Sequence, residues 1–550
     1  MIQSVGFIWK FILKQKNILA LGVFITGSVS FLTWLGPKLI ERIIDQGIVP
    51  HEYHLAFIGV AMLAGAEFLR LLSIFLSQVV YSYLGQNVIE GVRAKMVQHL
   101  LSLNISFFDG VSSGQMMTRV VSDTNALSDF FQSGFVSVLG NVASVIAIFV
   151  GLFNLNFKLG FVLLIAFLPI VYACSIFSKR LRWVYEHSRT QLSNLNSMLA
   201  DFLFGMRTIR SLGAGPAKFR ELDAQIQKYA NAQMQMVKTF ALFQPTLSLG
   251  TGVLLIILIK MGIPLIDSNA MKVGEWVAAL SYVILLQQPL TEISDRWNFF
   301  LAGLTSVDRI REVFQEQPEK VNSASPGRFV EIQMNGIKFK YPEAKTFALN
   351  GVSLKVKRGD WIGFYGESGS GKSTLLQMIY GFYSPEKGEL NWNGKSYEDL
   401  DLKKIRSHFG VVEQFPFLFS GTIEDNLTLF GEHDLDMPAL KSKFKGFILI
   451  ESLLAQPKLE VNERGNNLSM GQKQMIAFLR AYLANPDIWI LDEATAFFDQ
   501  EAEEEVMRAL ENLGSEITVI QVAHRLEALQ QMKQTIRVDS GCLYSTSSPN

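Results

Sequence analysis

The chain has few charged residues and almost no cysteine for its length. Charged side chains make up 18% of its 550 residues, and the two cysteines, Cys174 and Cys542, exclude a disulfide framework. Basic and acidic residues number 50 each, so no net charge attracts nucleic acid, and we expect no such partner. Hydrophobic residues reach 49% and the mean hydropathy is +0.23, too apolar for an ordinary soluble enzyme. The composition therefore predicts membrane spans and more than one domain.

Long uncharged stretches occupy the first half of the chain. The first lies between Lys16 and Lys38, where 21 uncharged residues (17–37) suffice to cross a hydrocarbon core about 30 Å thick. The others lie near residues 55–84, 130–157, 159–178, 238–266 and from Trp276 past Leu290, with a tight turn at 154–158. One such run could be a buried core helix, but six in succession predict an α-helical membrane domain with six transmembrane helices over residues 1–314.

Basic residues mark two long loops, between spans two and three and between spans four and five. They are Arg93, Lys95, Arg119, Lys179, Arg180, Arg182, Arg189, Arg207, Arg210, Lys218 and Arg220. The positive-inside rule places both loops and both termini in the cytoplasm. Both loops also read as helical, so we expect the spans to continue beyond the bilayer. The sequence predicts a multi-pass protein of a bacterial inner or plasma membrane, with its C-terminal domain cytoplasmic.

The second half of the chain has a different composition. Residues 315–327 (QEQPEKVNSASPG) are polar and read as a linker. From residue 328 to 550, short β-rich runs alternate with helical stretches, which predicts an α/β domain. The runs are 331–339, 349–356, 360–365, 409–412, 488–491 and 517–522.

A glycine-rich loop follows one of these strands. Residues 366–374 (GESGSGKST) come after the apolar strand 361–365 and before a helix expected to open at Leu375. Glycines let backbone N–H groups converge on phosphate oxygens, Lys372 can reach the β and γ phosphates, and the Ser373 hydroxyl suits Mg²⁺. An ordinary turn is the alternative, but the strand and the helix favour a P-loop ATPase. The predicted nucleotide contacts here are Gly366, Glu367, Ser368, Gly369, Ser370, Gly371, Lys372, Ser373 and Thr374.

A second apolar strand, 488–491, ends in two carboxylates, Asp492 and Glu493. At the carboxyl edge of a sheet, the first carboxylate can hold Mg²⁺ through water and the second can polarise an attacking water. The pattern is weak by itself. With a phosphate loop upstream in the same domain, it indicates nucleotide hydrolysis.

Further motifs resemble those of the ATP-binding cassette (ABC) transporters. Residues 468–472 (LSMGQ) are similar to the family signature LSGGQ, and Gln414 resembles its Q-loop glutamine. Tyr341 resembles the aromatic residue that stacks on adenine, and His524 the switch histidine. Each residue alone reads as an ordinary surface or loop residue, and the resemblance rests on their order and spacing. Six spans fused to one cassette resemble an exporter half-transporter, so the resemblance covers the whole chain.

The resemblance implies ATP and Mg²⁺ as cofactors and a role for each site residue. The implied catalytic residues are Glu493 as general base, with His524 and Gln414; the implied Mg²⁺ ligands are Ser373, Gln414 and Asp492. Tyr341 would stack on adenine. Ser469, Gly471 and Gln472 would close over the γ-phosphate of ATP on a second cassette, which implies a dimer. Phe108, Asp109, Gly114 and Asp123 resemble segments that couple the cassette to the spans.

Two positions depart from the family pattern. Met470 stands where the signature has its first glycine, and Ala496, in the segment 496–499, stands where a serine is usual. Because Ser469 and Gly471 are kept, we expect activity to survive. The resemblance thus implies that the C-terminal domain is an α/β P-loop ATPase domain of the ABC type.

The implied function is ATP-driven export of an amphipathic or hydrophobic substrate across the lipid bilayer, by alternating access of a homodimer. The substrate could be a peptide, a lipid or a drug. Alternatives stay open: a membrane ATPase acting as sensor or regulator, one half of a heterodimeric exporter, or a cytosolic P-loop ATPase of the DNA-repair type, against which the spans argue. Glu67 and Arg70, three residues apart in the second span, either form a packing ion pair or line the transport cavity.

Overall fold

The computed structural model describes residues 6, 11–131, 136–320, 322–342, 344–429, 435–494, 500–514, 516–524 and 526–546. The chain divides into two compact units. The membrane unit comprises residues 1–103 and 111–317, and the ATPase unit comprises residues 104–110 and 318–550.

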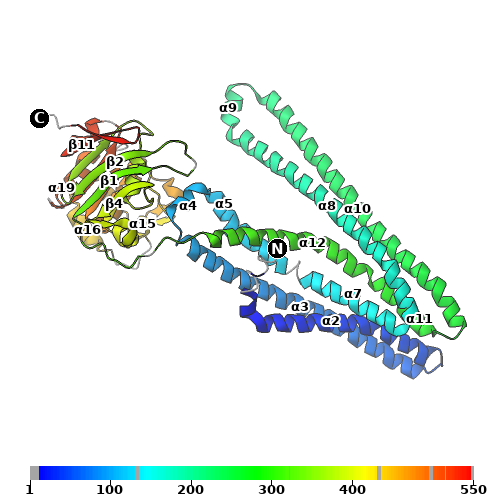
Figure 1. Ribbon diagram of the computed structural model, residues 1–550. Coiled ribbons are helices and arrows are strands. Elements are labelled where there is room, and N and C mark those ends of the chain that lie inside the picture. The colour runs from blue at the N-terminus through cyan, green and yellow to red at the C-terminus, as the bar shows by residue number, and fades with distance from the viewer. Residues whose placement is uncertain are drawn as a thin grey trace. The chain divides into compact units, whose positions relative to one another are not determined.

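The membrane unit is built of helices. They are η1 (Leu13–Gln15), α2 (Lys16–Arg42), the π-helix η2 (Ile43–Ile48), α3 (Tyr53–Leu100), α5 (Ser113–Met117), the π-helix η3 (Thr118–Asp123), α6 (Thr124–Asp129), α7 (Val136–Leu155), α8 (Phe157–Phe204), α9 (Met206–Ser211), α10 (Gly215–Asp267), α11 (Val273–Leu285) and α12 (Gln287–Gln315) (Figure 1). Helices suit a bilayer because each backbone N–H and C=O is paired within its own segment.

Five of the predicted spans lie on long apolar helices. Among the described residues, the helical runs 13–48, 53–100, 137–155, 157–204 and 215–267 are long and apolar enough to cross a membrane. Helices α3 and α8 have 48 residues and α10 has 53, or roughly 70–80 Å at 1.5 Å per residue. They are therefore more than twice as long as a hydrocarbon core is thick, as expected from the helical loops. Asn156 makes the predicted tight turn and caps α8, accepting a hydrogen bond from Leu159 N at 3.1 Å.

The region of the sixth predicted span is divided. Helix α11 has 13 residues, about 20 Å, and ends at Leu285, while α12 begins at Gln287. Pro289 explains the break, because proline lacks an N–H and its ring clashes with the carbonyl four residues earlier, that of Leu285. A sixth crossing would need α11 together with the first turns of α12, and the count of six stays a prediction.

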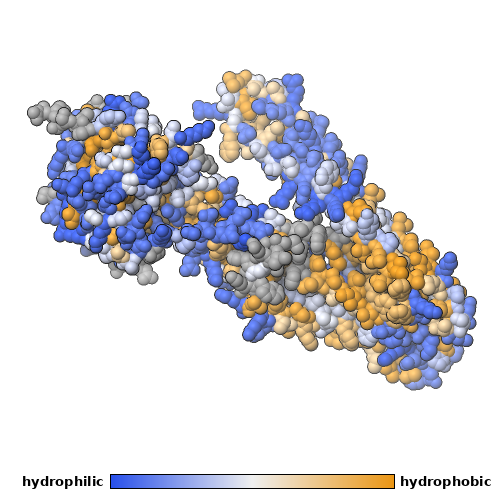
Figure 2. All heavy atoms as spheres, in the orientation of Figure 1, coloured by the Kyte–Doolittle hydropathy of each residue, from blue (hydrophilic) through white to orange (hydrophobic). Residues whose placement is uncertain are grey.

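Helices α8 and α10 run side by side as an antiparallel pair joined by α9 (Figure 1). Towards α9 their contacts become polar. Ser188 Oγ donates to Gln233 Oε1 at 2.7 Å, and Gln225 Nε2 donates to Gln191 Oε1 at 3.1 Å. Figure 2 shows the same change in colour, from orange over the spans to mostly blue along these arms. The polar arms correspond to the second of the two basic loops.

Asp123, expected in a coupling segment, is a buried carboxylate inside the membrane unit. It is 2% exposed and accepts hydrogen bonds from Ser306 Oγ at 3.2 Å and from Arg309 Nε at 2.9 Å. A buried charge needs such pairing. Asp123 therefore ties η3 to α12.

The ATPase unit holds two main sheets and their helices. The six-stranded sheet has the order β12 (Cys542–Thr546), β11 (Gln534–Asp539), β3 (Trp361–Tyr365), β10 (Thr518–Ala523), β9 (Ile488–Asp492), β6 (Phe409–Val412); the four-stranded sheet has the order β2 (Leu349–Lys357), β1 (Glu331–Phe339), β4 (Lys387–Trp392), β5 (Lys395–Ser396); and β7 (Gly421–Thr422) pairs with β8 (Glu460–Val461). The helices are α4 (Ile105–Gly110), α13 (Lys372–Ile379), η5 (Tyr397–Asp399), α14 (Leu402–Arg406), α15 (Ile423–Thr428), α16 (Met437–Lys443), α17 (Ile448–Leu454), η6 (Glu463–Gly465), α18 (Met470–Leu483), α19 (Gln500–Glu511) and η7 (Leu526–Leu529).

The core strands of this unit are apolar because they are covered on both faces. All six residues of β10 are buried, as are the first four of β3 and of β9. These three strands lie side by side and parallel. Their carboxyl ends therefore meet at one edge of the sheet, where the candidate site lies.

Candidate active site

The glycine-rich loop leaves the sheet at the end of β3. Strand β3 occupies the predicted residues, but α13 begins at Lys372, three residues before the predicted Leu375. The prediction of the helix start was wrong because Leu375 N already donates to Gly371 O at 2.9 Å, so the first helical turn includes Lys372. The loop thus lies directly on the N-terminus of a helix, where backbone N–H groups lack partners within the helix.

Glycine is required at three loop positions. Gly369 and Gly371 have φ of +79° and +107°, a region that other residues rarely adopt. A Cβ atom on Gly371 would lie 2.6 Å from Ala348 O, and one on Gly366 would lie 2.2 Å from Val538 O. The loop consequently keeps its backbone bare, which leaves its N–H groups accessible to an anion.

Two polar side chains of the loop are directed inward. Lys372 is 5% exposed, and its Nζ donates to Gly366 O and Glu367 O, both at 2.8 Å. Burial lowers the pKa of Lys372. The Ser370 hydroxyl is buried and has no hydrogen-bond partner within the described part of the chain. Unpaired donors around a buried ammonium fit a phosphate group.

The strand register brings the predicted carboxylates to this loop. Asp492 pairs with Val522 across β9 and β10, and Ala523 pairs with Tyr365 across β10 and β3. Burial, followed by the charge of Glu493, raises the pKa of Asp492 to about 6. The raised pKa means that the ionised form of Asp492 is destabilised. A nearby cation would stabilise that form, so Asp492 fits a divalent metal ion.

Glu493 lies in contact with both other predicted catalytic residues. Its Oε1 lies 2.8 Å from His524 Nε2, and its Oε2 accepts a hydrogen bond from Gln414 Nε2. Its backbone has φ of +50°, which is uncommon for a residue other than glycine, and its N–H donates to Val522 O at 3.0 Å. Strained backbone of this kind clusters at functional sites.

Tyr341 lies beside the helix that follows the loop. Its hydroxyl donates to Gln377 Oε1 at 2.8 Å and lies 3.2 Å from Thr374 Oγ1. Its ring meets that of Tyr383 edge to face, with the centroids 5.4 Å apart. The side chains of Glu367, Ser368 and Ser373 are exposed at the mouth of the loop.

The signature residues form the start of α18, as expected. Ser469 is the N-cap: Gln472 N donates to Ser469 Oγ at 3.2 Å, and Ser469 N donates to Gln472 Oε1 at 2.9 Å. Met470 is the first helical residue, so the position does not need glycine's backbone freedom. Within the described residues, the side-chain hydrogen bonds of this cap stay inside the signature, and none joins Ser469 to the phosphate loop. Ala496 and the rest of segment 496–499 lie outside the described residues.

Gln474 is a site residue that the sequence analysis missed. Its side chain is 0% exposed, and Nε2 donates to Gln414 O at 3.1 Å, which connects the signature helix to the Q-loop. The signal was a glutamine directly before the apolar run 475–479 (MIAFL), on the buried side of the helix.

Comparison with known proteins gives consistent matches over most of the chain. A family model described as ABC transporter transmembrane region matches residues 19–290, and one described as ABC transporter matches residues 349–496. The uncharacterized ABC transporter ATP-binding protein YknV of Bacillus subtilis (strain 168) is 31% identical over 506 residues, which cover 91% of this chain and 83% of that protein.

The chain belongs to the ABC transporter family. ATP-dependent lipid A-core flippases are also similar to it: that of Vibrio vulnificus (strain YJ016) is 26% identical over 98% of this chain and 93% of its own length, and that of Vibrio cholerae is 26% identical over 92% and 88%. The chain is thus an ABC exporter, a multi-pass membrane protein that binds ATP and couples its hydrolysis to transport.

Proposed function

We propose that the transporter is a homodimer that exports an amphipathic substrate, with a lipid as the favoured class. The flippases similar to it over nearly its whole length support a lipid. The distribution of basic residues supports the orientation in which the ATPase unit and both termini are cytoplasmic, because the long loops hold the Lys and Arg clusters. A peptide or a drug remains the alternative substrate.

A polar cavity in the membrane unit is the main structural support for an amphipathic substrate. It has a volume of about 210 Å³ and lies between α2, α3, α7 and α12. Its charged lining residues are Arg70, Glu292 and Arg296. Glu292 Oε2 accepts a hydrogen bond from Asn141 Nδ2 at 3.1 Å. Charged groups that line a cavity inside a membrane domain mark a substrate path or a packing pair.

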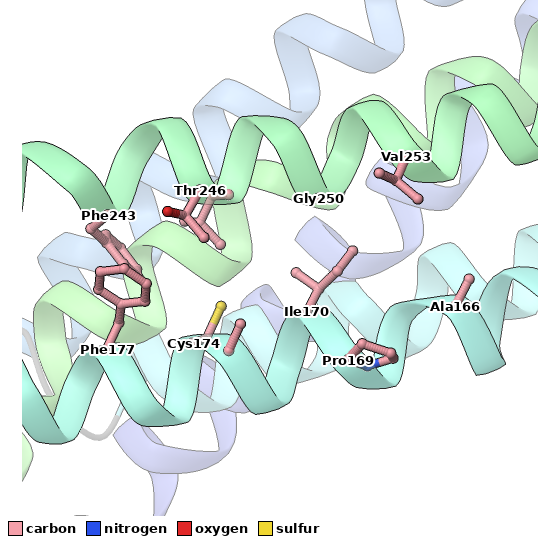
Figure 3. A pocket seen from close by; sticks show the side chains of 11 residues that line it. Ala166, Pro169, Ile170, Cys174, Phe177, Phe243, Thr246, Gly250 and Val253 are labelled. Carbon is pink, nitrogen blue, oxygen red and sulfur yellow. The ribbon is translucent and has the colours of Figure 1, made fainter.

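Apolar space for the other part of such a substrate lies between α8 and α10. A cavity of about 380 Å³ is lined there by Pro169, Ile170 and Phe177 on one helix and Phe243, Gly250 and Val253 on the other (Figure 3). In Figure 3 the side chains of the two helices point toward one another across this space. Thr246 contributes a hydroxyl and Cys174 a thiol to an otherwise apolar lining.

In the proposed ATPase reaction, each residue at the sheet edge has one role. Lys372 and the bare backbone of the loop bind phosphate oxygens, and Tyr341 stacks on adenine. Ser373, Gln414 and Asp492 would hold Mg²⁺, which supplies charge neutralisation on the phosphates when bound. Glu493 accepts the proton of the attacking water, and the 2.8 Å contact with His524 orients its carboxylate.

A homodimer follows from the signature. The N–H groups at the start of α18 form an anion site, and Ser469 and Gln472 satisfy only part of it. This chain carries the phosphate loop, the carboxylate pair and the signature, so two copies would supply two complete sites and a different partner is unnecessary. Ser469→Arg should abolish ATPase activity of the purified protein, with Ser452→Arg on the exposed face of α17 as the control. Full activity of a demonstrated monomer contradicts the homodimer.

The export proposal is tested in proteoliposomes. The protein is reconstituted with a fluorescent lipid in one leaflet, and its movement is followed on addition of MgATP. We expect ATP-dependent movement that Glu493→Gln abolishes. If the protein hydrolyses ATP and moves a labelled peptide or drug but no lipid, the lipid is rejected as the substrate class and the export activity is supported.

A further inference from the structure

A second apolar cavity of the membrane unit ends in positive charge. It has a volume of about 470 Å³ and lies between α7, α8 and α12. Val142, Val145, Phe167 and Leu290 are among its apolar lining residues. Lys179 and Arg182, together with Ser175 and Ser178, line it from α8. We call this cavity the α7–α8–α12 groove.

The cations of the groove lie at the edge of the hydrocarbon core. Lys179 is the first charged residue of α8 after Lys158, and the 20 residues between them (159–178) span about 30 Å as a helix. Trp183 and Tyr185, which are 61% and 49% exposed, follow directly. Exposed Trp and Tyr gather where a membrane meets water. The apolar part of the groove therefore lies at acyl-chain depth and its cationic end at headgroup depth.

These cations are available to a ligand. Arg182 Nε lies 3.1 Å from Glu186 Oε1, but the side chains are 50% and 64% exposed, and surface ion pairs of this kind are weak. Lys179 takes part in none of the ion pairs found among the described residues. Among the described residues that line the cavity, none is acidic. A phosphate group could pair with Arg182 in competition with Glu186. It could also pair with Lys179, for which the described residues provide no competing carboxylate.

We propose that the α7–α8–α12 groove binds an anionic phospholipid of the cytoplasmic leaflet. One acyl chain lies between α7, α8 and α12, and the phosphate lies against Lys179 and Arg182. The leaflet follows from the orientation proposed above. The binding itself does not depend on lipid being the transported substrate, so this inference goes beyond the proposed function.

The experiment uses the full chain in nanodiscs that contain phosphatidylglycerol or phosphatidylcholine with a diazirine in one acyl chain. After illumination, cross-linked peptides are identified by mass spectrometry. We expect phosphatidylglycerol to label α7, α8 and α12 peptides around Val145, Val171 and Leu290, and phosphatidylcholine to label them much less. Each cation near an anionic headgroup contributes about 1 kcal/mol, so Lys179→Gln with Arg182→Gln should reduce this labelling roughly tenfold or more.

The matched control is Arg180→Gln with Arg189→Gln, which removes two exposed charges from the same helix outside the groove. It should keep the labelling. A second variant, Val171→Trp, fills the groove without changing charge and should reduce labelling while the protein still elutes as the folded species. Equal labelling by the two lipids, or full phosphatidylglycerol labelling of the Lys179/Arg182 variant, overturns the proposal.

The outcomes separate this site from the export proposal. Groove labelling by phosphatidylglycerol without ATP-driven lipid movement in proteoliposomes supports the groove and rejects lipid export. If the wild-type protein moves lipid on addition of ATP but its groove is not labelled, the groove proposal is rejected and the export proposal stands.

Discussion

Phenylalanines of the two units have opposite surroundings. In the ATPase unit, Phe329 and Phe364 are 0% exposed, whereas in the membrane unit Phe24 and Phe57 are 73% and 76% exposed. The residue type is the same and the solvent differs, since lipid tails are as apolar as the side chain and exert no hydrophobic force on it. Apolar content therefore predicts that a segment leaves water, but not whether protein or lipid receives it.

Polar residues reverse this contrast. In the ATPase unit, parallel strands bring Asp492, Glu493 and His524 to one edge, where Glu493 and His524 lie 2.8 Å apart in the proposed ATPase site. In the membrane unit, the polar groups of the 210 Å³ cavity come from four helices whose spacing in the sequence gives no motif. Chemistry that depends on local spacing is readable from a sequence, and chemistry assembled by helix packing is not.

The largest expected effect is at the ATPase site. Glu493→Gln should lower ATP turnover about 10²- to 10⁴-fold, or roughly 3–5 kcal/mol in the barrier, because the proposed base is lost while nucleotide binding is kept. The measurement is steady-state phosphate release with parallel nucleotide binding. Glu389→Gln, an exposed residue of β4, is the control and should leave turnover unchanged. Near wild-type turnover of Glu493→Gln would show that another group is the base.

The solvent comparison itself gives the next prediction. Phe364→Ala should destabilise the ATPase unit by about 3–5 kcal/mol, since it leaves a cavity at a side chain that is 0% exposed. Phe57→Ala removes the same atoms from a side chain that faces outward on α3, and we expect less than about 1 kcal/mol. Denaturant unfolding of both variants checks this. Equal losses would mean that Phe57 is covered in the assembled protein.

The sequence predicted strands that are buried on both faces, such as β3 and β10, and strands that are buried on one face, such as β1 and β2, but it missed the other described strands. The predicted runs match β1, β2, β3, β6, β9 and β10 to within two residues at either end. Polar or charged residues occupy three of six positions in β4 (KGELNW) and four of six in β11 (QTIRVD), and their pairing with neighbours, rather than their composition, makes them strands. The break at Leu286 has a different, local cause, the effect of Pro289 on the preceding helical turn, to which a count of uncharged residues is insensitive.

The residues of the candidate site were predicted one by one, but not their connections. Tyr341, Gln414, Glu493 and His524 were predicted from order and spacing, and their roles stay predictions. The buried hydrogen bond from Gln474 to Gln414 joins residues 60 apart, which no local pattern reveals. The residues expected to be a linker likewise dock on the ATPase unit: Glu319 accepts from Arg406 Nη1 at 2.9 Å, and Asp401 N donates to Ala324 O at 3.0 Å.

That docked linker gives a prediction of intermediate size. Arg406 also donates to Gly381 O at 3.0 Å and stacks on Phe382, so it holds the linker against the end of α13. Arg406→Met should destabilise the ATPase unit by roughly 1.5–3 kcal/mol, because it leaves the Glu319 carboxylate largely buried without its partner. The matched control, Arg537→Met, breaks an exposed pair with Asp539 and should cost under about 1 kcal/mol. Thermal unfolding of the two variants compares them, and equal costs would show that the linker is not held.

The smallest expected change in stability concerns the ion pair of the second span, and it decides whether the membrane unit carries chemistry that its sequence hides. Arg70 Nε lies 2.8 Å from Glu67 Oε2, and Arg70 also lines the polar cavity with Arg296. Replacing both residues by glutamine removes the two charges together, so we expect a change within about 1 kcal/mol and unaltered basal ATPase activity. Glu67→Gln alone leaves Arg70 unpaired and should be the more damaging variant.

If the pair only fixes helix packing, the double variant exports lipid normally in proteoliposomes. If Arg70 contacts an anionic headgroup, the double variant loses export and substrate-stimulated hydrolysis while its unfolding midpoint is unchanged, and Arg296→Gln should then have the same phenotype.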